Sequence, residues 1–169
     1  KQIQEVVQPM EMEKLIIAGA GPAGVSAALY AVRSGITPLV LHKGGGALEK
    51  AVKIENYYGL PEPVTGAELY KTGLKQLESF QIPVVEEELL AVEYDGDYTV
   101  QTTEHTYHSK ALILATGAKR NTLALKELKK YEGSGISYCA VCDGFFYRGK
   151  EVAVLGNGPY ALHEAKVLE

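Results

Sequence analysis

The amino-acid sequence predicts an α/β fold with a parallel sheet, a small antiparallel layer and the start of a second unit of the first kind. Two observations predict this fold. A short apolar run, a glycine cluster and a helical run follow one another at residues 14–34 and again from residue 151. Between these repeats, short apolar runs are separated by turn residues, which is typical of strands joined by hairpins.

The first unit opens with a strand at residues 14–18, a glycine turn and a helix at residues 22–34. A second strand at residues 38–41 should lie parallel to the first, because a helix-length connection separates them. The loop at residues 42–65 is too long for a passive connection, and long loops in compact domains usually bind something. We therefore expect this loop to contribute to a ligand site.

The middle of the chain predicts one helix and several extended segments. The helix is expected at residues 66–80, because apolar residues recur there at helical spacing. Asp95 and Gly96 mark a hairpin turn. The extended segments are residues 82–94, whose apolar residues suit a pair of strands, and residues 98–103, 105–108 and 111–115. The run of glutamates at residues 86–88 is expected to be a solvated face.

Composition and charge exclude several classes of protein. The chain has 169 residues, with 17 basic and 21 acidic side chains and a net charge of −4. It lacks the basic stripe that nucleic-acid backbones demand. No apolar run reaches the roughly 20 residues of a membrane-spanning helix, and the polar start lacks the apolar core of a signal peptide. We expect a cytoplasmic protein in which residues 1–13 are an extension outside the fold.

A glycine cluster follows the first strand and opens the first helix, at Gly19-Ala20-Gly21-Pro22-Ala23-Gly24. In that context the cluster predicts dinucleotide binding, because glycines permit a tight turn and close approach to a pyrophosphate, and the helix N-terminus supplies N–H groups. The ribose-binding acid expected after the second strand is missing, since His42 and Lys43 stand there. Main-chain groups of residues 44–48 could hold the adenosine half, the site could prefer extra negative charge, or binding could be lost.

Two cysteines are too few for a disulfide scaffold or a four-thiolate zinc site. Cys139 and Cys142 stand one helical turn apart, close enough for a disulfide and for thiol exchange. Asp143 follows directly and could protonate a leaving thiolate. Two buried structural cysteines are the alternative, but the adjacent acid favours a redox pair.

Five motifs in order resemble the low-molecular-weight, bacterial-type thioredoxin reductases of the FAD-dependent pyridine nucleotide-disulfide oxidoreductases. They are GAGPAG at residues 19–24, IENYYG at 54–59, ATGA at 115–118, CAVCDGFFYRGK at 139–150 and VAVLGNGPYA at 152–161. The cysteine motif between two glycine motifs is the most specific of them. Its position argues against the glutathione reductase branch, whose cysteines lie close behind the first glycine motif.

The resemblance implies a Rossmann-like FAD-binding domain at residues 14–118 and the start of an NAD(P)H-binding domain with the cysteine pair at residues 119–169. It implies a homodimer in which electrons pass from NADPH through FAD and the cysteine pair to thioredoxin or a similar dithiol protein. Cys142 would face the flavin, Cys139 would attack the partner disulfide, and Asp143 would act as acid and base.

The resemblance also implies two sets of cofactor-binding residues. The expected FAD-binding residues are Gly19, Gly21, Pro22, Ala23, Gly24, His42, Lys43, Gly45, Gly46, Ala47, Asn56, Leu89, Thr116 and Gly117. The expected nicotinamide-binding residues are Gly156, Gly158 and Ala161.

Three positions depart from the family pattern. Ala47 stands where the family commonly has glutamine, Val141 where it usually has threonine, and Pro159-Tyr160 is unusual in the second glycine motif. Two other functions therefore stay open. One is a flavoenzyme driven by reduced ferredoxin or a dithiol oxidase that passes electrons to oxygen. The other is a redox-inactive nucleotide-binding protein.

Overall fold

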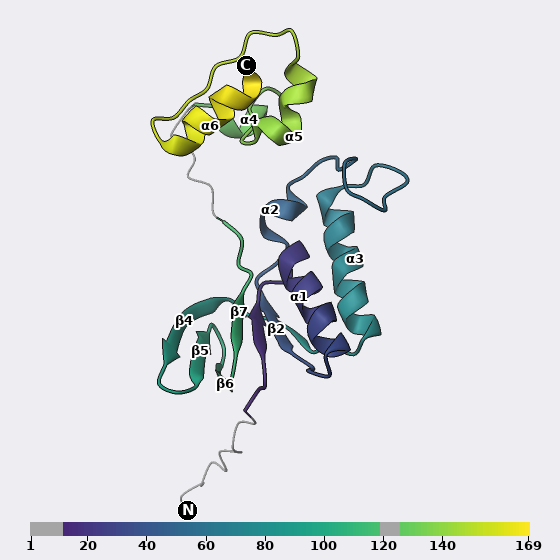
Figure 1. Ribbon diagram of the computed structural model, residues 1–169, viewed down its shortest axis with the longest axis vertical. Coiled ribbons are helices and arrows are strands. Elements are labelled where there is room, and N and C mark those ends of the chain that lie inside the picture. The colour runs from purple at the N-terminus through teal and green to yellow at the C-terminus, as the bar shows by residue number, and fades with distance from the viewer. Residues whose placement is uncertain (1–11, 119–125) are drawn as a thin grey trace, which may run out of the picture. The chain divides into compact units, whose positions relative to one another are not determined.

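The structure, a computed structural model, describes residues 12–118 and 126–169 (Figure 1). The chain divides into two compact units, Lys1–Arg120 and Asn121–Glu169. We call them the N-terminal unit and the C-terminal unit. Most of the predicted extension, residues 1–11, lies outside the described residues. Glu13, which was also assigned to the extension, belongs to the fold, because its N–H donates to the carbonyl of His108 at 2.9 Å.

A four-stranded parallel sheet forms the centre of the N-terminal unit, in the order β3-β2-β1-β7. These strands are β1 (Ile16–Ala18), β2 (Leu39–His42), β3 (Val84–Glu86) and β7 (Leu112–Leu114). The pairs β1–β2, β1–β7 and β2–β3 are all parallel. This confirms the predicted parallel arrangement of the first two strands, and it puts the carboxyl ends of all four strands at one edge.

Two helices, α1 (Pro22–Arg33) and α3 (Gly66–Ser79), lie side by side along this sheet (Figure 1). Helix α1 has Pro22 in its first turn, where the missing N–H costs nothing. Helix α3 begins with a capping box, in which the Thr65 side chain accepts from the Glu68 N–H and Glu68 accepts from the Thr65 N–H. A short helix, α2 (Gly46–Glu49), interrupts the loop that precedes α3.

The strand pleat divides the core of the unit into two clusters. Ile17 and Val40 pack with buried residues of α1 and α3, among them Val25 and Leu77. Their sequence neighbours point the other way, and Ile16 packs with Val100 of the antiparallel layer. Because both faces of the parallel sheet are covered, its strands consist of continuous apolar residues. Such runs are easily recognised in the sequence.

The antiparallel layer consists of β4 (Leu89–Tyr94), β5 (Tyr98–Thr102) and β6 (Thr106–Ser109). The predicted hairpin at Asp95 and Gly96 joins β4 to β5, and Gly96 adopts a φ of +82°. Residues 82–94 contain two strands, but the prediction that these strands pair with each other is wrong. Strand β3 joins the parallel sheet and β4 joins the antiparallel layer, so the two strands are not partners.

The glutamate run at residues 86–88 is not a uniform solvated face, because the side chain of Glu87 is buried. Its carboxylate accepts hydrogen bonds from Thr102 Oγ and, at 3.2 Å, from Tyr107 Oη, and it lies 2.8 Å from His105 Nδ1. The bond from Thr102 and the neighbours His105 and Tyr107 lower the pKa of Glu87 more than burial raises it. Glu87 therefore ties the start of β4 to the β5–β6 turn.

The C-terminal unit is built from short helices. They are α4 (Leu128–Tyr131), α5 (Ala140–Asp143), the 3₁₀ helix η1 (Gly144–Tyr147) and α6 (Pro159–Leu168). The strand predicted at residues 151–155 is wrong for this chain: these residues form no strand, and Val152, Val154 and Leu155 are 48%, 40% and 68% exposed. A strand needs a neighbour to satisfy its N–H and C=O groups, and residues 126–169 supply none there.

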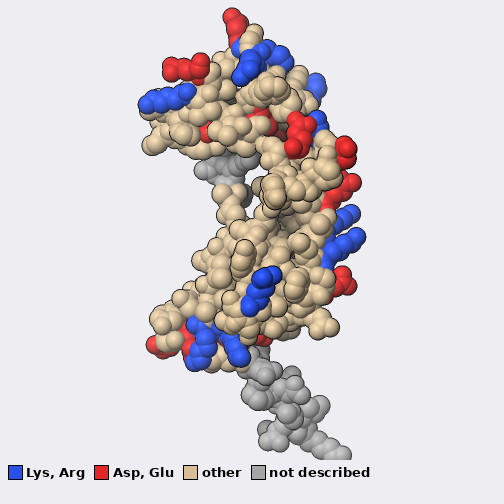
Figure 2. Space-filling model, turned by 45° about the vertical axis from the view of Figure 1, so that its right-hand side comes forward, with Lys and Arg blue, Asp and Glu red and all other residues tan. Residues whose placement is uncertain are grey.

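Charged side chains of both signs are interspersed on the face of the molecule shown in Figure 2, and no continuous basic stripe crosses that face. Within the described part of the chain, every helix is too short or too polar to cross a bilayer.

Candidate functional site

The first glycine turn connects β1 to α1 and depends on glycine at two positions. Gly19 adopts a φ of +116°, and a Cβ there would overlap the carbonyl oxygen of Ala115. A Cβ on Gly24 would overlap the carbonyl oxygen of Gly19. The Gly19 N–H donates to the carbonyl of Leu41 at 2.7 Å. Close packing of α1 on the strands thus requires both glycines.

Gly21 has a different role from its two neighbours, because a Cβ at this position would meet no atom within 4 Å. It is the N-cap of α1 in an extended conformation, with no side-chain cap. The first N–H groups of a helix have no partner inside the helix, and they favour an anion. The backbone around Gly21, Pro22 and Ala23 therefore fits the pyrophosphate of a dinucleotide.

The parallel sheet brings several predicted residues to this turn. Ala115 directly follows β7 and lies beside Gly19, and its N–H donates to the carbonyl of Ala18 at 2.7 Å. Thr116 and Gly117 follow directly, and Gly117 adopts a φ of +68°. Ligands of open parallel sheets bind outside the carboxyl ends of the strands, where the strand order reverses. Such a point lies between β1 and β7. The chain passes from β1 to β2 and β3 on one side of β1, and it then returns to form β7 on the other side.

The end of β2 holds His42 and Lys43 in place of the expected acid. His42 Nδ1 accepts from the Gly44 N–H at 3.0 Å and lies 2.9 Å from Tyr70 Oη. Lys43 forms an ion pair with Glu88. The tertiary fold therefore brings a carboxylate to the end of β2 from 45 residues away, and no local sequence signal could have predicted it.

The predicted glycine loop after β2 is held by α2 and α3. The Gly45 N–H donates to Glu49 Oε2 at 2.9 Å, and a Cβ on Gly45 would overlap the Glu49 side chain. Gly46 adopts a φ of +59°, which favours glycine. Burial, with the nearby carboxylates of Glu49 and Glu86, raises the pKa of Tyr70. The side chain of Tyr70 therefore keeps a neutral hydroxyl group next to the glycine loop.

Other predicted FAD-binding residues are dispersed around the same unit. Ala47 is exposed in α2, and Asn56 is exposed in the loop that leads to α3. Leu89 begins β4. Within the described residues, no hydrogen bond joins these three to the glycine turn.

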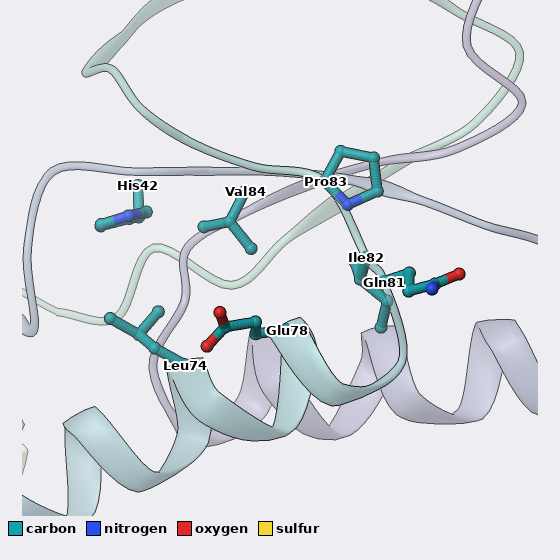
Figure 3. A pocket seen from close by; sticks show the side chains of 7 residues that line it. All are labelled: His42, Leu74, Glu78, Gln81, Ile82, Pro83 and Val84. Carbon is teal, nitrogen blue, oxygen red and sulfur yellow. The ribbon is translucent and has the colours of Figure 1, made fainter.

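A groove of about 480 Å³ lies between α3 and β3 (Figure 3). His42 is its one predicted site residue, and its other lining residues are Leu74, Glu78, Gln81, Ile82, Pro83 and Val84. The groove does not include the glycine turn, so it is not the predicted dinucleotide site.

The predicted redox pair forms a disulfide in the C-terminal unit. Cys139 is bonded to Cys142, with 5.3 Å between their Cα atoms. Cys139 is the N-cap of α5, and its Sγ accepts from the Cys142 N–H at 3.2 Å. Cys142 is exposed and Cys139 is half-buried. The pair is therefore open to exchange with another molecule, unlike two cysteines enclosed in a core.

The Asp143 carboxylate is held by a residue that sequence reasoning missed. Ser137 Oγ donates to Asp143 Oδ2 at 2.5 Å and accepts from the Cys139 N–H at 3.1 Å. The Asp143 N–H donates to the carbonyl of Cys139 at 3.1 Å. Asp143 is thus linked to Cys139 through the main chain and through Ser137.

The second glycine motif lines a groove of about 590 Å³ at the start of α6. The groove includes all three predicted nicotinamide-binding residues, Gly156, Gly158 and Ala161. A Cβ on Gly156 would lie 2.6 Å from the Cβ of Ala161, so this turn also depends on a close glycine contact. Its geometry therefore resembles the first motif locally, although no strand precedes it.

Comparison with known proteins supports the resemblance read from the motifs. The family model described as pyridine nucleotide-disulphide oxidoreductase matches residues 13–169. Thioredoxin reductase of Aquifex aeolicus is 39% identical over 95% of this chain and 51% of its own length. The crystal structure of thioredoxin reductase from Streptococcus pyogenes has a TM-score of 0.83 and 36% identity, over 95% of this chain and 53% of that one.

Another relative has a different name. Glucosaminate ammonia-lyase of Pseudomonas fluorescens is 40% identical over 92% of this chain and 49% of its own length. The chain thus spans about half the length of the curated relatives it matches.

Proposed function

Because the chain belongs to the pyridine nucleotide-disulphide oxidoreductase family, we propose that its protein is a flavin-dependent disulfide reductase. Electrons pass from NADPH through FAD and the Cys139–Cys142 pair to thioredoxin or a similar small dithiol protein. The observation that carries the proposal is the disulfide beside Asp143, with Cys142 exposed and Cys139 half-buried. Relatives named thioredoxin reductase, at 39% and 37% identity, support the choice of partner.

The two glycine motifs divide the cofactors between them in this proposal. Residues 14–118 form the FAD-binding domain, with the start of α1 on the pyrophosphate and the loop after β2 on the adenosine. Residues 119–169 begin the nicotinamide-binding domain. FAD, when bound, supplies a two-electron carrier between the nicotinamide and the cysteine pair. The open space at Gly21 and the groove at Gly156 support this division.

The cysteine pair carries out two exchange steps. Two electrons and two protons first convert the Cys139–Cys142 disulfide to a dithiol. Asp143 takes the proton of the Cys139 thiol, and the resulting thiolate attacks one sulfur of the partner disulfide to form a mixed disulfide. Asp143 returns that proton to the thiolate that is expelled. Cys142 then loses its proton and attacks Cys139 Sγ, which restores the first disulfide, and the proton passes to the second partner thiolate that is released. The hydrogen bonds that link Asp143 to Cys139 through the main chain and Ser137 support this role.

An anaerobic titration of the full-length protein with NADPH, followed by the visible absorbance of the flavin, tests the electron path. We expect bleaching of the flavin band. Cys142→Ser should keep the flavin and its reduction by NADPH but lose reduction of a protein disulfide, because only the relay to the partner is removed. Protein-disulfide reduction that survives in Cys142→Ser would contradict the proposal.

A second candidate keeps the flavin and cysteines but changes the direction of electron flow. The second glycine motif departs from the family pattern at Pro159-Tyr160, and this departure keeps a donor other than NADPH open. Such a protein would take electrons from reduced ferredoxin or pass them to oxygen. A bound flavin that stays oxidised with NADPH, but is reduced by ferredoxin or by a dithiol, would favour this candidate.

We also propose a homodimer located in the cytoplasm, where thiols are kept reduced and a dithiol relay can turn over. The mass of the full-length protein in solution, from light scattering, tests the dimer.

A further inference from the structure

Helix α6 contacts the redox segment on both sides of Cys139. The Tyr160 hydroxyl donates to the carbonyl of Tyr138, the residue before Cys139, at 2.8 Å. The Glu164 carboxylate accepts from the N–H of Ala140, the residue after Cys139, at 2.5 Å. Two side chains of one helix thus hold the peptide groups that flank a single cysteine.

The two side chains act from one face of α6. Tyr160 and Glu164 are four residues apart, the spacing that puts side chains one above the other on a helix. Tyr160 is the second residue of α6, directly behind the glycine turn at Gly158 and Pro159. It is also one of the two positions at which the second glycine motif is unusual. The same turn of helix therefore serves the glycine motif and the cysteine segment.

We propose that Tyr160 and Glu164 are positioning residues that fix the main chain around Cys139 and stabilise the disulfide form of the pair. The proposal rests on the redox role of Cys139 and Cys142 proposed above. It assigns a role to the unusual tyrosine of the glycine motif. It also links the helix that carries this motif to the thiols that exchange with the partner.

The contacts are strong enough to influence the disulfide equilibrium. The bond from the Ala140 N–H ends on a half-buried carboxylate, and bonds to charged groups stabilise more than neutral ones. Both bonds are present while the sulfur atoms are joined. Removing either bond frees the turn and lowers the effective concentration of one thiol near the other, so the disulfide becomes easier to reduce.

The test measures the disulfide–dithiol equilibrium of the full-length protein in anaerobic dithiothreitol redox buffers at pH 6, with alkylation to count free thiols. We expect Tyr160→Phe and Glu164→Ala each to shift the equilibrium toward the dithiol by about threefold to tenfold, or about 15 to 30 mV. Glu164→Gln keeps an acceptor oxygen but loses the charge, so its shift should be smaller than that of Glu164→Ala.

The matched controls are Tyr131→Phe and Glu151→Ala, at exposed residues of the same unit, and both should leave the equilibrium unchanged. Circular dichroism melting shows whether each variant is folded. An unchanged equilibrium in both Tyr160→Phe and Glu164→Ala would overturn the positioning role, and so would equal shifts in Glu164→Ala and Glu164→Gln. A wild-type pair that forms no reversible disulfide would instead contradict the proposed function itself.

Discussion

The two glycine motifs have similar local geometry but very different surroundings. The first lies between a strand whose residues Ile16 and Ile17 are fully buried and a helix that covers the sheet. The second follows residues 152–155, which form no strand and are exposed. Each turn has a close glycine contact, at Gly24 in the first motif and at Gly156 in the second.

The difference shows which part of a βαβ unit is local. A glycine turn and the helix after it need only a few adjacent residues, so both motifs form them. A strand needs hydrogen-bonding neighbours and a covered face, and those come from distant parts of the chain. The first motif obtains them from β2 and β7. In the second motif the described residues offer no such partner.

The largest difference in stability between the two regions should come from shortening an apolar side chain before each glycine motif to alanine. Ile17→Ala should lower the free energy of unfolding by about 3 kcal/mol or more, because the residue is fully buried between strands and helices. Val154→Ala in the 169-residue chain should cost less than about 1 kcal/mol, since Val154 is exposed. Urea denaturation followed by circular dichroism measures both. Equal losses of unfolding free energy in the two variants would contradict the difference in packing between the two regions.

Alanine at the first glycine turn should separate packing from ligand binding. Gly24→Ala should cost about 2 to 3 kcal/mol, because the new Cβ overlaps the Gly19 carbonyl. Gly21→Ala meets no protein atom, so it should fold normally and lose affinity for FAD. Thermal melting and flavin content of the purified variants check this pair. A stable Gly24→Ala variant would show that α1 can move away from β1.

The stability of the N-terminal unit should depend on Glu87 at acidic pH. The folded state lowers the pKa of Glu87, so its contribution is present above the ordinary glutamate pKa of about 4.3. That contribution should decline as the pH falls below this value through the folded-state pKa. Glu87→Gln should flatten the decline in melting temperature between about pH 5 and pH 3. Glu93→Gln, at an exposed site on β4, is the control, and a parallel decline in all three proteins would contradict the role of Glu87.

The smallest effect on stability is expected from Gly156→Ala. The new Cβ would lie 2.6 Å from the Cβ of Ala161, at the exposed end of α6. This end has few packed neighbours, so a small shift should relieve the contact at a cost below about 1 kcal/mol. Affinity for a nicotinamide nucleotide should fall, which isothermal titration calorimetry measures. Loss of stability equal to that of Gly24→Ala would show that the second turn is packed as tightly as the first.

Much of the N-terminal unit could be predicted because its signals are local. The apolar run before Gly19, the proline at the start of α1 and the hairpin at Asp95 and Gly96 each specify structure within a few residues. The partner of each strand could not be predicted in the same way. Residues 82–94 have suitable alternation for two strands, but β3 pairs with β2 and β4 pairs with β5, with the buried Glu87 between them.

The same distinction between local and distant residues applies to the candidate site. Its glycines and its cysteine pair were predicted because the chemistry requires those residue types at those spacings. The side chains that hold them were not predicted. Glu88 reaches Lys43 from 45 residues away, and Glu164 reaches the Ala140 N–H from 24 residues away. Ser137 is close in sequence to Cys139, but a serine has no distinctive pattern there.

The sequence by itself determined the turns, the helix starts, the spacing of Cys139 and Cys142, and the resemblance to a disulfide reductase. These features depend on backbone conformations and side-chain chemistry within a few residues. Only the tertiary structure decided which strands pair, that Glu87 is buried, and that Tyr160 and Glu164 flank Cys139. Such contacts form when distant segments are brought together to bury apolar surface and satisfy polar groups, and no short stretch of sequence contains that information.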